Sequence, residues 1–168
     1  MDIYWLGRVP YRPTWELQER CRQQVLAGGP EVLLLCEHDP VLTLGRSAGI
    51  SDLLTTPAGL AAAGVDLVVS DRGGQITYHG PGQLVAYPIR TVNRGVRAHV
   101  QALADAAVAI ASALAVPAQR SEDPVGVFVG PRKLAAIGVS VHQRVSCHGM
   151  AINVTAAASA AFRRGLFH

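Results

Sequence analysis

The sequence predicts an α+β domain in which helices flank a mixed β-sheet. Three observations support this fold class. The chain has 168 residues, 49% of them hydrophobic, which is enough for one substantial core and short for two domains. Apolar runs of strand length alternate with helical patterns. No repeat or linker interrupts this alternation, so we expect residues 1–168 to form a single domain.

The N-terminal quarter predicts three strands and one helix. Residues 2–6 form a first short strand. A helical pattern begins near Pro13 and ends at Gly-Gly-Pro in residues 28–30. Residues 31–38 (EVLLLCEH) are apolar enough for a buried strand, and residues 41–45 (VLTLG) follow as another.

The middle of the chain predicts a short helix and two strands. Thr56 and Pro57 are residue types that favour the N-cap and first turn of a helix, which we expect to end near Gly64. Residues 65–70 (VDLVVS) and 83–89 (QLVAYPI) have the composition of strands. The segment between them predicts turns, because it contains four glycines and a proline.

The C-terminal part predicts a long helix and a hairpin. Residues 97–116 are alanine-rich and apolar enough for a helix that is mostly covered. A loop with three prolines follows: Pro117, Pro124 and Pro131. Residues 133–143 and 144–154 alternate imperfectly between apolar and polar positions, which predicts two hairpin strands turning near residues 142–144. From Thr155 onward the tail is helix-prone.

Charge and cysteine content limit the class of protein. The net charge is +3 with a pI near 9.0, and the basic residues are spread along the chain, which favours an acidic protein partner over nucleic acid. Cys21, Cys36 and Cys147 have no metal-binding spacing. The N-terminus lacks a signal-peptide pattern, and no segment is apolar enough for a membrane span. We therefore expect a cytoplasmic protein without membrane association, metal or cofactor.

Two glycine-rich turns bracket the segment QITYH. Gly73-Gly74 precedes it and Gly80-Pro81-Gly82 follows it, so the backbone can approach a ligand that a Cβ atom would exclude. Such a segment can direct its amides at a carbonyl or an acyl chain, and the same pattern also fits an ordinary glycine-rich hairpin. It is neither a Walker loop nor a dinucleotide fingerprint, because neither GK[ST] nor a helix follows. His79 and His148 each precede a glycine, so two such turns could face one cleft.

Lys133 is the only lysine in a chain that has fourteen arginines. An ammonium can lose its proton, whereas a guanidinium cannot. Lys133 is therefore either retained for its chemistry or present by chance on the surface.

Four runs together resemble the lipoyl(octanoyl) transferase family. They are CEHDPVLTLGR (36–46), RGGQITYHGPGQLVAYP (72–88), RKLAAIGV (132–139) and HGMAINV (148–154). They occur in the family's order and cover almost the whole chain. The resemblance implies a fold similar to the catalytic core of lipoate and biotin protein ligases.

The resemblance also implies an activity and its partners. Members of this family move an octanoyl group from octanoyl-acyl carrier protein to a lysine of lipoyl domains, through a thioester on an enzyme cysteine. The implied acceptors are the E2 subunits of 2-oxoacid dehydrogenases and the H protein of glycine cleavage. Lys133 matches the lysine that activates this cysteine, since a neighbouring ammonium favours the thiolate. The implied substrate pocket comprises Arg72, Gly73, Gly74, Gln75, Ile76, Thr77, Tyr78, His79, Ala136, Ile137, Gly138, Gly149, Met150 and Ala151.

The sequence departs from the family at the nucleophile. The family's Pro-Cys-Gly motif is expected near or after His168, and it is absent from these 168 residues. The chain is then shorter than a complete family member, or it binds without turnover, or Cys147 replaces the nucleophile. Relocation to Cys147 has a stereochemical difficulty, because neighbouring residues of a strand point to opposite faces and His148 is expected to face the pocket. We expect all three cysteines to be core residues.

Two other functions remain open at this point. An ATP-dependent lipoate or biotin ligase would need more phosphate-binding cations near the glycine turn than Arg72. A catalytically inactive homologue that binds acyl groups or lipoyl domains would need no nucleophile.

Overall fold

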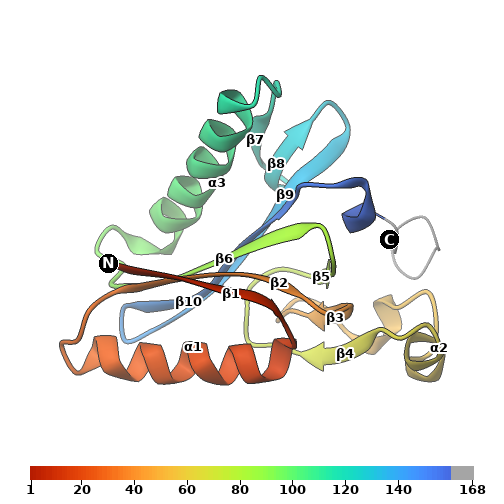
Figure 1. The fold of residues 1–168 in the computed structure, drawn as a ribbon, viewed down its shortest axis with the longest axis horizontal. Helices are drawn as coiled ribbons and strands as arrows, with labels where there is room; N and C mark the ends of the chain where they lie inside the picture. The colour runs from red at the N-terminus through yellow and green to blue at the C-terminus, as the bar shows by residue number, and fades with distance from the viewer. Residues whose placement is uncertain (160–168) are drawn as a thin grey trace.

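Within residues 1–159, which the computed structural model describes, seven strands form one mixed sheet in the order β1-β2-β6-β10-β9-β8-β7 (Figure 1). The strands are β1 (Asp2–Val9), β2 (Val32–His38), β6 (Gln83–Ile89), β10 (Val145–Asn153), β9 (Arg132–His142), β8 (Val125–Val129) and β7 (Gln119–Glu122). β1 runs parallel to β2, and the other neighbours are antiparallel. The predicted α+β fold with a mixed sheet is confirmed.

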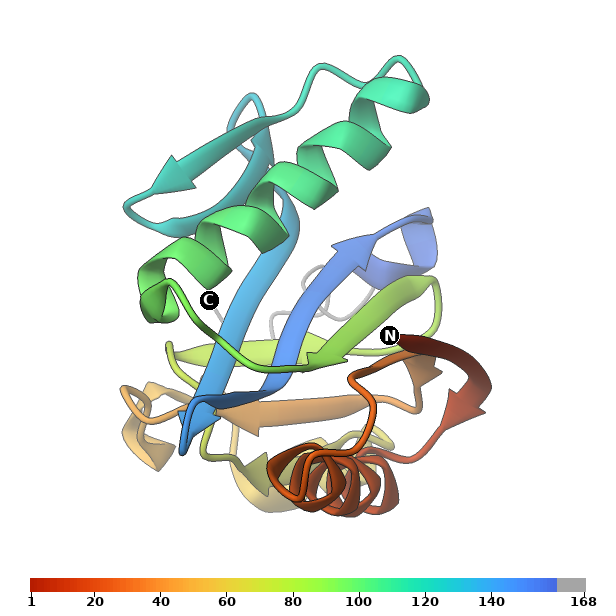
Figure 2. The same ribbon diagram turned by 90° about the vertical axis from the view of Figure 1, so that its left-hand side faces the viewer.

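Helices α1 (Tyr11–Leu26) and α3 (Gly95–Ala113) cover opposite faces of this sheet (Figures 1 and 2). Cys21 and Val25 of α1 pack against alternate residues of β2, β6 and β10. Leu103, Ala104 and Ala107 of α3 pack against residues of β6, β8, β9 and β10. Because successive strand residues alternate between the two cores, the central strands are mostly apolar on both faces. In the described part of the chain, no helix is both long and apolar enough to cross a membrane.

A smaller sheet lies beside the large one, in the order β4-β3-β5. Its strands are β3 (Val41–Leu44), β4 (Asp66–Val69) and β5 (Ile76–His79), and the short helices η1 (Ile50–Asp52) and α2 (Pro57–Ala62) lie between β3 and β4. The predicted N-cap is present, since the Thr56 hydroxyl accepts a hydrogen bond from the Gly59 amide at 3.1 Å. Leu60 of α2 packs under this sheet with Leu42 and Tyr78.

Three segments differ from the prediction. β5 lies in the segment predicted as turns, and its residues pair with β3 across all four positions. β7 and β8 replace a predicted loop; β7 has the sequence QRSE and therefore lacks the apolar alternation that marks a strand. α1 begins at Tyr11, directly after Pro10. The helix predicted from Thr155 begins as η2 (Ala156–Ser159), and its remainder lies outside the described residues.

Candidate active site

A hollow of about 290 Å³, part of it open to solvent, lies on the α1 side of the large sheet, where the small sheet meets it. Its lining residues come from α1, from β5 and the loop before it, and from β6, β9 and β10. They are Tyr11, Arg72, Thr77, His79, Val85, Tyr87, Ala136, Gly138, His148, Gly149, Met150 and Ala151. Segments far apart in the sequence, including both glycine-histidine regions, therefore share one hollow.

Eight of the predicted pocket residues line this hollow: Arg72, Thr77, His79, Ala136, Gly138, Gly149, Met150 and Ala151. The other six are placed around it. Ile76 and Tyr78 point into the core under the small sheet, and Ile137 packs against the α3 core. The main chain of Gly73, Gly74 and Gln75 binds neighbouring backbone, with Gly73 N donating to Val139 O at 2.9 Å.

Arg72 fixes the loop before β5. Its guanidinium is buried and donates to Thr43 Oγ1 and to the carbonyl oxygens of Thr43 and Gly73 at 2.6–3.1 Å. Gly45 and Gly138 allow this close approach, because a Cβ atom at either position would lie within 2.8 Å of a loop carbonyl oxygen. The two glycines that flank this loop, after β3 and within β9, are therefore required by packing against the loop and its buried arginine.

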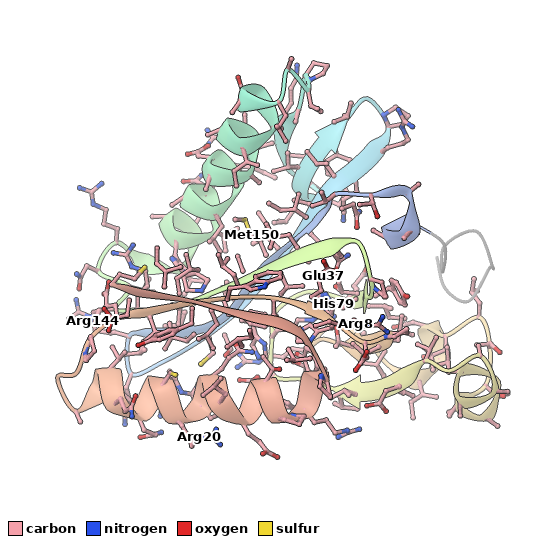
Figure 3. All side chains as sticks on the ribbon, in the orientation of Figure 1. Arg8, Arg20, Glu37, His79, Arg144 and Met150 are labelled. Atoms are coloured by element: carbon pink, nitrogen blue, oxygen red, sulfur yellow. The ribbon has the colours of Figure 1, made fainter. Side chains whose placement is uncertain are left out.

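His79 ends β5 at the point where the small sheet meets β6 (Figure 3). Its Nδ1 is 2.7 Å from Gln83 Oε1. Gln83 Nε2 in turn donates to Tyr78 O at 3.2 Å and to Asn153 Oδ1 at 2.9 Å, and Asn153 Nδ2 donates to Lys133 O at 3.1 Å. Burial lowers the pKa of His79 to about 3, so the imidazole is neutral at pH 7.

His38 and Tyr87 form a second polar pair beside His79. His38 Nδ1 is 2.9 Å from the carbonyl oxygen of Val9 and therefore donates to it. Burial lowers the pKa of His38, so its Nε2 is unprotonated at pH 7 and accepts from Tyr87 Oη at 2.8 Å. The same burial raises the pKa of Tyr87 well above its ordinary value, so this pair is uncharged.

His148 lies on the α1 side because its backbone departs from a regular strand. Its φ is +58°, which turns the side chain away from the α3 side that Met150 and Ile152 share. Its Nε2 lies 2.7 Å from Asp71 Oδ1, and its Nδ1 lies 3.4 Å from Tyr11 Oη. This hydrogen bond from His148 is the largest cause that lowers the pKa of Asp71 to about 2. An ionised aspartate thus orients a buried imidazole at the edge of the hollow.

Comparison with known proteins identifies the family. A sequence model described as the lipoyl protein ligase A/B catalytic domain matches residues 10–166. The chain belongs to this family. An octanoyltransferase of Chloroflexus aggregans is 40% identical over 161 residues, which cover 92% of this chain and 73% of that protein. An octanoyltransferase of Desulfovibrio desulfuricans is 39% identical over 152 residues, which cover 89% of this chain and 64% of that protein.

A solved structure agrees with the family assignment at the level of the fold. The crystal structure of lipoate-protein ligase A bound with ATP has a TM-score of 0.77 to this chain at 16% identity, covering 95% of this chain and 70% of that one. The family resemblance predicted from the four sequence motifs is therefore confirmed. This chain spans about two thirds to three quarters of the length of the two curated relatives.

Lys133, which the family resemblance assigns to cysteine activation, lies at the start of β9 and does not line the hollow. Its Nζ lies over the Phe128 ring, 5.3 Å from the centroid. Partial burial lowers the pKa of Lys133, which makes loss of its proton easier. Its main chain connects to His79 through Asn153 and Gln83. Its role in this family member stays a prediction.

The three cysteines are buried and free, as predicted. Burial raises the pKa of Cys36 and of Cys147 to about 12, which leaves both as thiols at pH 7. The prediction that Cys147 and His148 face opposite sides of β10 was wrong. Cys147 Sγ lies 3.8 Å from Gln18 O of α1, and the His148 ring lies 5.7 Å from the Trp15 ring of α1, because the positive φ of His148 breaks the alternation. The family's nucleophile, expected near or after His168, lies outside the described residues.

The sequence prediction missed several polar residues of the site. Asp71, Tyr11, His38, Tyr87 and Gln83 hold the imidazoles or line the hollow. A signal for three of them was present, since His38, Tyr87 and Gln83 lie within the motif runs 36–46 and 72–88. Tyr11 gave no signal, because it lies outside the motif runs and reaches the hollow only through the packing of α1.

Proposed function

We propose that this protein is an acyltransferase that moves an octanoyl group onto a lysine of a lipoyl domain. The observation that carries the proposal is the hollow itself, which is built from three of the four motif runs that resemble the family. The names of the curated relatives, octanoyltransferases, support the same activity.

The lining of the hollow suits a medium-length acyl chain. Its apolar part comes from Val85, Ala136 and Ala151, with Gly138 and Gly149 leaving space at the sheet surface. Each methylene removed from water contributes about 0.8 kcal/mol, so an eight-carbon chain is held largely by apolar contact. The imidazoles of His79 and His38 beside this surface are polar and uncharged at pH 7, which suits a neutral thioester or amide.

The donor and the intermediate belong to the same proposal. We infer that octanoyl-acyl carrier protein delivers the group to the cysteine expected near or after His168, and that Lys133 favours its thiolate. The path of the chain supports this placement. Val154 and Thr155 donate their amides to Gly82 O at 3.0 and 3.1 Å, and Glu37 Oε2 accepts from Gly82 N at 2.9 Å. The chain therefore leaves β10 beside the glycine turn that follows His79.

The acceptors proposed are the lipoyl domains of E2 subunits and the glycine cleavage H protein, in the cytoplasm. The test incubates a form of the protein that carries the family's cysteine with octanoyl-acyl carrier protein and an apo lipoyl domain, and measures the intact mass of each protein. We expect an octanoyl adduct first on the enzyme and then on the lipoyl domain.

Two outcomes would favour other functions. Modification of the lipoyl domain by octanoate with ATP, but not by octanoyl-acyl carrier protein, would make the protein a ligase. Binding of octanoate without any adduct on enzyme or lipoyl domain would make it a non-catalytic binder.

A further inference from the structure

One acceptor on a residue that lines the hollow has no hydrogen-bond partner within the described residues 1–159. Among residues 1–159, several buried side-chain nitrogen and oxygen atoms lack a hydrogen bond, and of these only His79 Nε2 belongs to a residue that lines the hollow. His79 is 5% exposed, so bulk water does not readily satisfy this atom. A buried polar atom without a partner costs free energy, which a ligand that supplies a donor would recover.

The neighbours of His79 fix which of its nitrogens carries the proton. The carbonyl oxygen of Tyr78 can only accept, so the Gln83 atom 3.2 Å from it is the amide nitrogen. Gln83 Oε1 then faces His79 Nδ1, which must donate to it. Because the imidazole is neutral, Nε2 carries only a lone pair. The open site on His79 therefore accepts a hydrogen bond and cannot donate one.

The ring is also held in place against rotation. Tyr11 stacks on His79 with ring centroids 5.9 Å apart and an interplanar angle of 15°, and His38 lies edge-on at 5.8 Å. Asn153 anchors Gln83 from the side of β10. The lone pair of Nε2 thus has a fixed direction before any ligand binds.

We propose that His79 Nε2 accepts a hydrogen bond from the N–H of the lysine amine that attacks the octanoyl carbonyl, and from the amide N–H of the product. The inference rests on the proposed octanoyl transfer. In that step the amine nitrogen bonds to the acyl carbon, the carbon–sulfur bond breaks, and the sulfur leaves as a thiolate that takes up the proton lost by the amine. His79 orients the amine and does not keep its proton, since a neutral imidazole with so low a pKa is a poor base.

The octanoyl chain itself has no hydrogen-bond donor, but the pantetheine arm of acyl carrier protein has one in its amide N–H. Three small ligands separate these sources. N-butyl octanamide has an N–H on the acyl carbon, butyl octanoate has none, and S-(2-acetamidoethyl) octanethioate has the amide of the pantetheine arm. The experiment measures the dissociation constant of each by calorimetry for the wild-type protein, for His79→Phe and for His99→Phe.

We expect the amide-to-ester preference of the wild-type protein to fall about tenfold in His79→Phe, the loss of one hydrogen bond. Comparing ratios cancels the different hydration of amide and ester. His99→Phe is the matched control, because His99 Nε2 on α3 also lacks a partner but lies outside the hollow, and it should keep the wild-type ratio. In the wild-type protein, ¹⁵N spectra should show the unprotonated nitrogen of His79 shifting on binding N-butyl octanamide.

Each other outcome overturns the inference. If His79→Phe keeps the wild-type ratio, or the His79 nitrogen is unmoved at saturation, the hydrogen bond does not form. If only the thioester depends on His79, the donor is the pantetheine amide and the inference is wrong. If none of the three ligands binds, the octanoyl site of the proposed function fails and the inference fails with it. If His79→Phe does not fold, the ¹⁵N spectra of the wild-type protein still test the inference.

Discussion

His148 illustrates how a few residues set the direction of one side chain. Its φ of +58° is unusual for a residue with a Cβ atom. Gln18 Oε1 accepts its main-chain N–H at 2.8 Å, and Asp71 holds its Nε2 at 2.7 Å. These two contacts hold a conformation that would otherwise cost about 1 kcal/mol or more. The imidazole therefore stays in the hollow and does not join the α3 core.

Replacing Asp71 with asparagine should weaken this arrangement in a pH-dependent way. The pKa of Asp71 is lowered to about 2 from 3.8, so its carboxylate stabilises the folded protein above about pH 4 and loses this effect as pH falls through 2. We expect Asp71→Asn to lower the free energy of unfolding at pH 7 by about 1 kcal/mol, discounted for the partial exposure of the side chain.

Urea unfolding of both proteins between pH 7 and pH 2 checks this. The difference between them should shrink below pH 4. Asp2→Asn, at the exposed start of β1, serves as the control and should follow the wild-type curve. A difference that stays constant down to pH 2 would contradict the prediction.

Lys133 should affect transfer and not binding. Its lowered pKa makes proton transfer easier, and its amine lies outside the hollow. In a form that carries the family's cysteine, we expect Lys133→Ala to reduce octanoyl transfer about 100-fold or more. Its octanoate affinity should stay within about twofold, because the side chain makes no apolar contact with the acyl site. Initial rates by mass spectrometry and affinities by calorimetry separate the two effects.

Lys133→Arg should fail in the same way, because arginine cannot give up its proton. The neighbouring exposed cation provides the control, and Arg132→Ala should keep its activity. Unchanged turnover in either Lys133 variant would remove this lysine from the mechanism.

At the scale of elements, β10 can pair with β6 only because Gly149 has no side chain. A Cβ atom at Gly149 would lie 2.1 Å from Ala86 O and 2.8 Å from Pro88 Cδ. Both atoms belong to the neighbouring strand and cannot move without opening the sheet. We expect Gly149→Ala to lower the free energy of unfolding by about 3 kcal/mol or more.

Thermal and urea unfolding measure this effect. Gly49→Ala is a suitable control, since the nearest atom to its Cβ would be the flexible Ser51 Oγ at 3.3 Å, and it should change stability by about 0.5 kcal/mol or less. Equal stability of the two variants would show that β10 and β6 can separate locally at little cost.

The elements that the sequence predicted are those whose burial leaves a pattern. β2 and β6 are covered on both faces and are mostly apolar, and α3 has one dense apolar stripe. β7 is an exposed edge strand and carries no such pattern. β5 is a strand because β3 pairs with it, a long-range cause that its own glycine-flanked sequence cannot reveal.

The face of a side chain was harder to predict than its strand. The period-two pattern correctly predicted a strand around residue 148, and His148 faces the hollow as expected, yet Cys147 lies on the same side of the strand and not on the opposite one. The family motifs brought eight expected residues to one hollow. The partners that orient its imidazoles, such as Asp71 and Tyr11, are fixed by tertiary packing and were not predicted.

Over the whole molecule, two imidazoles at the hollow, His79 and His38, are neutral because they are buried. His79 and His38 both have lowered pKa values, and desolvation is the first cause for each. Neutral imidazoles keep the site compatible with an apolar acyl group. The same burial makes the folded protein sensitive to acid, because the unfolded chain can protonate these residues and the folded chain resists it.

The free energy of unfolding should therefore fall as pH drops below about 6.5. The folded pKa of His79 is lowered to about 3 from 6.5, so its contribution is complete above pH 6.5 and is lost progressively down to about pH 3. Between these values a single such group changes stability by about 1.4 kcal/mol per pH unit, and His38 acts in the same sense. Over two pH units this loss is a large part of the ~5 kcal/mol by which a marginally stable domain is folded, so we expect acid unfolding above pH 3.

Urea unfolding at intervals from pH 7 to pH 4 measures how steeply the free energy of unfolding depends on pH. His79→Phe should reduce that slope, whereas His142→Phe, at the exposed end of β9, should keep it. A flat profile over this range would mean that the folded protein protonates His79 as readily as the unfolded chain, and that the imidazole is neither buried nor neutral as inferred.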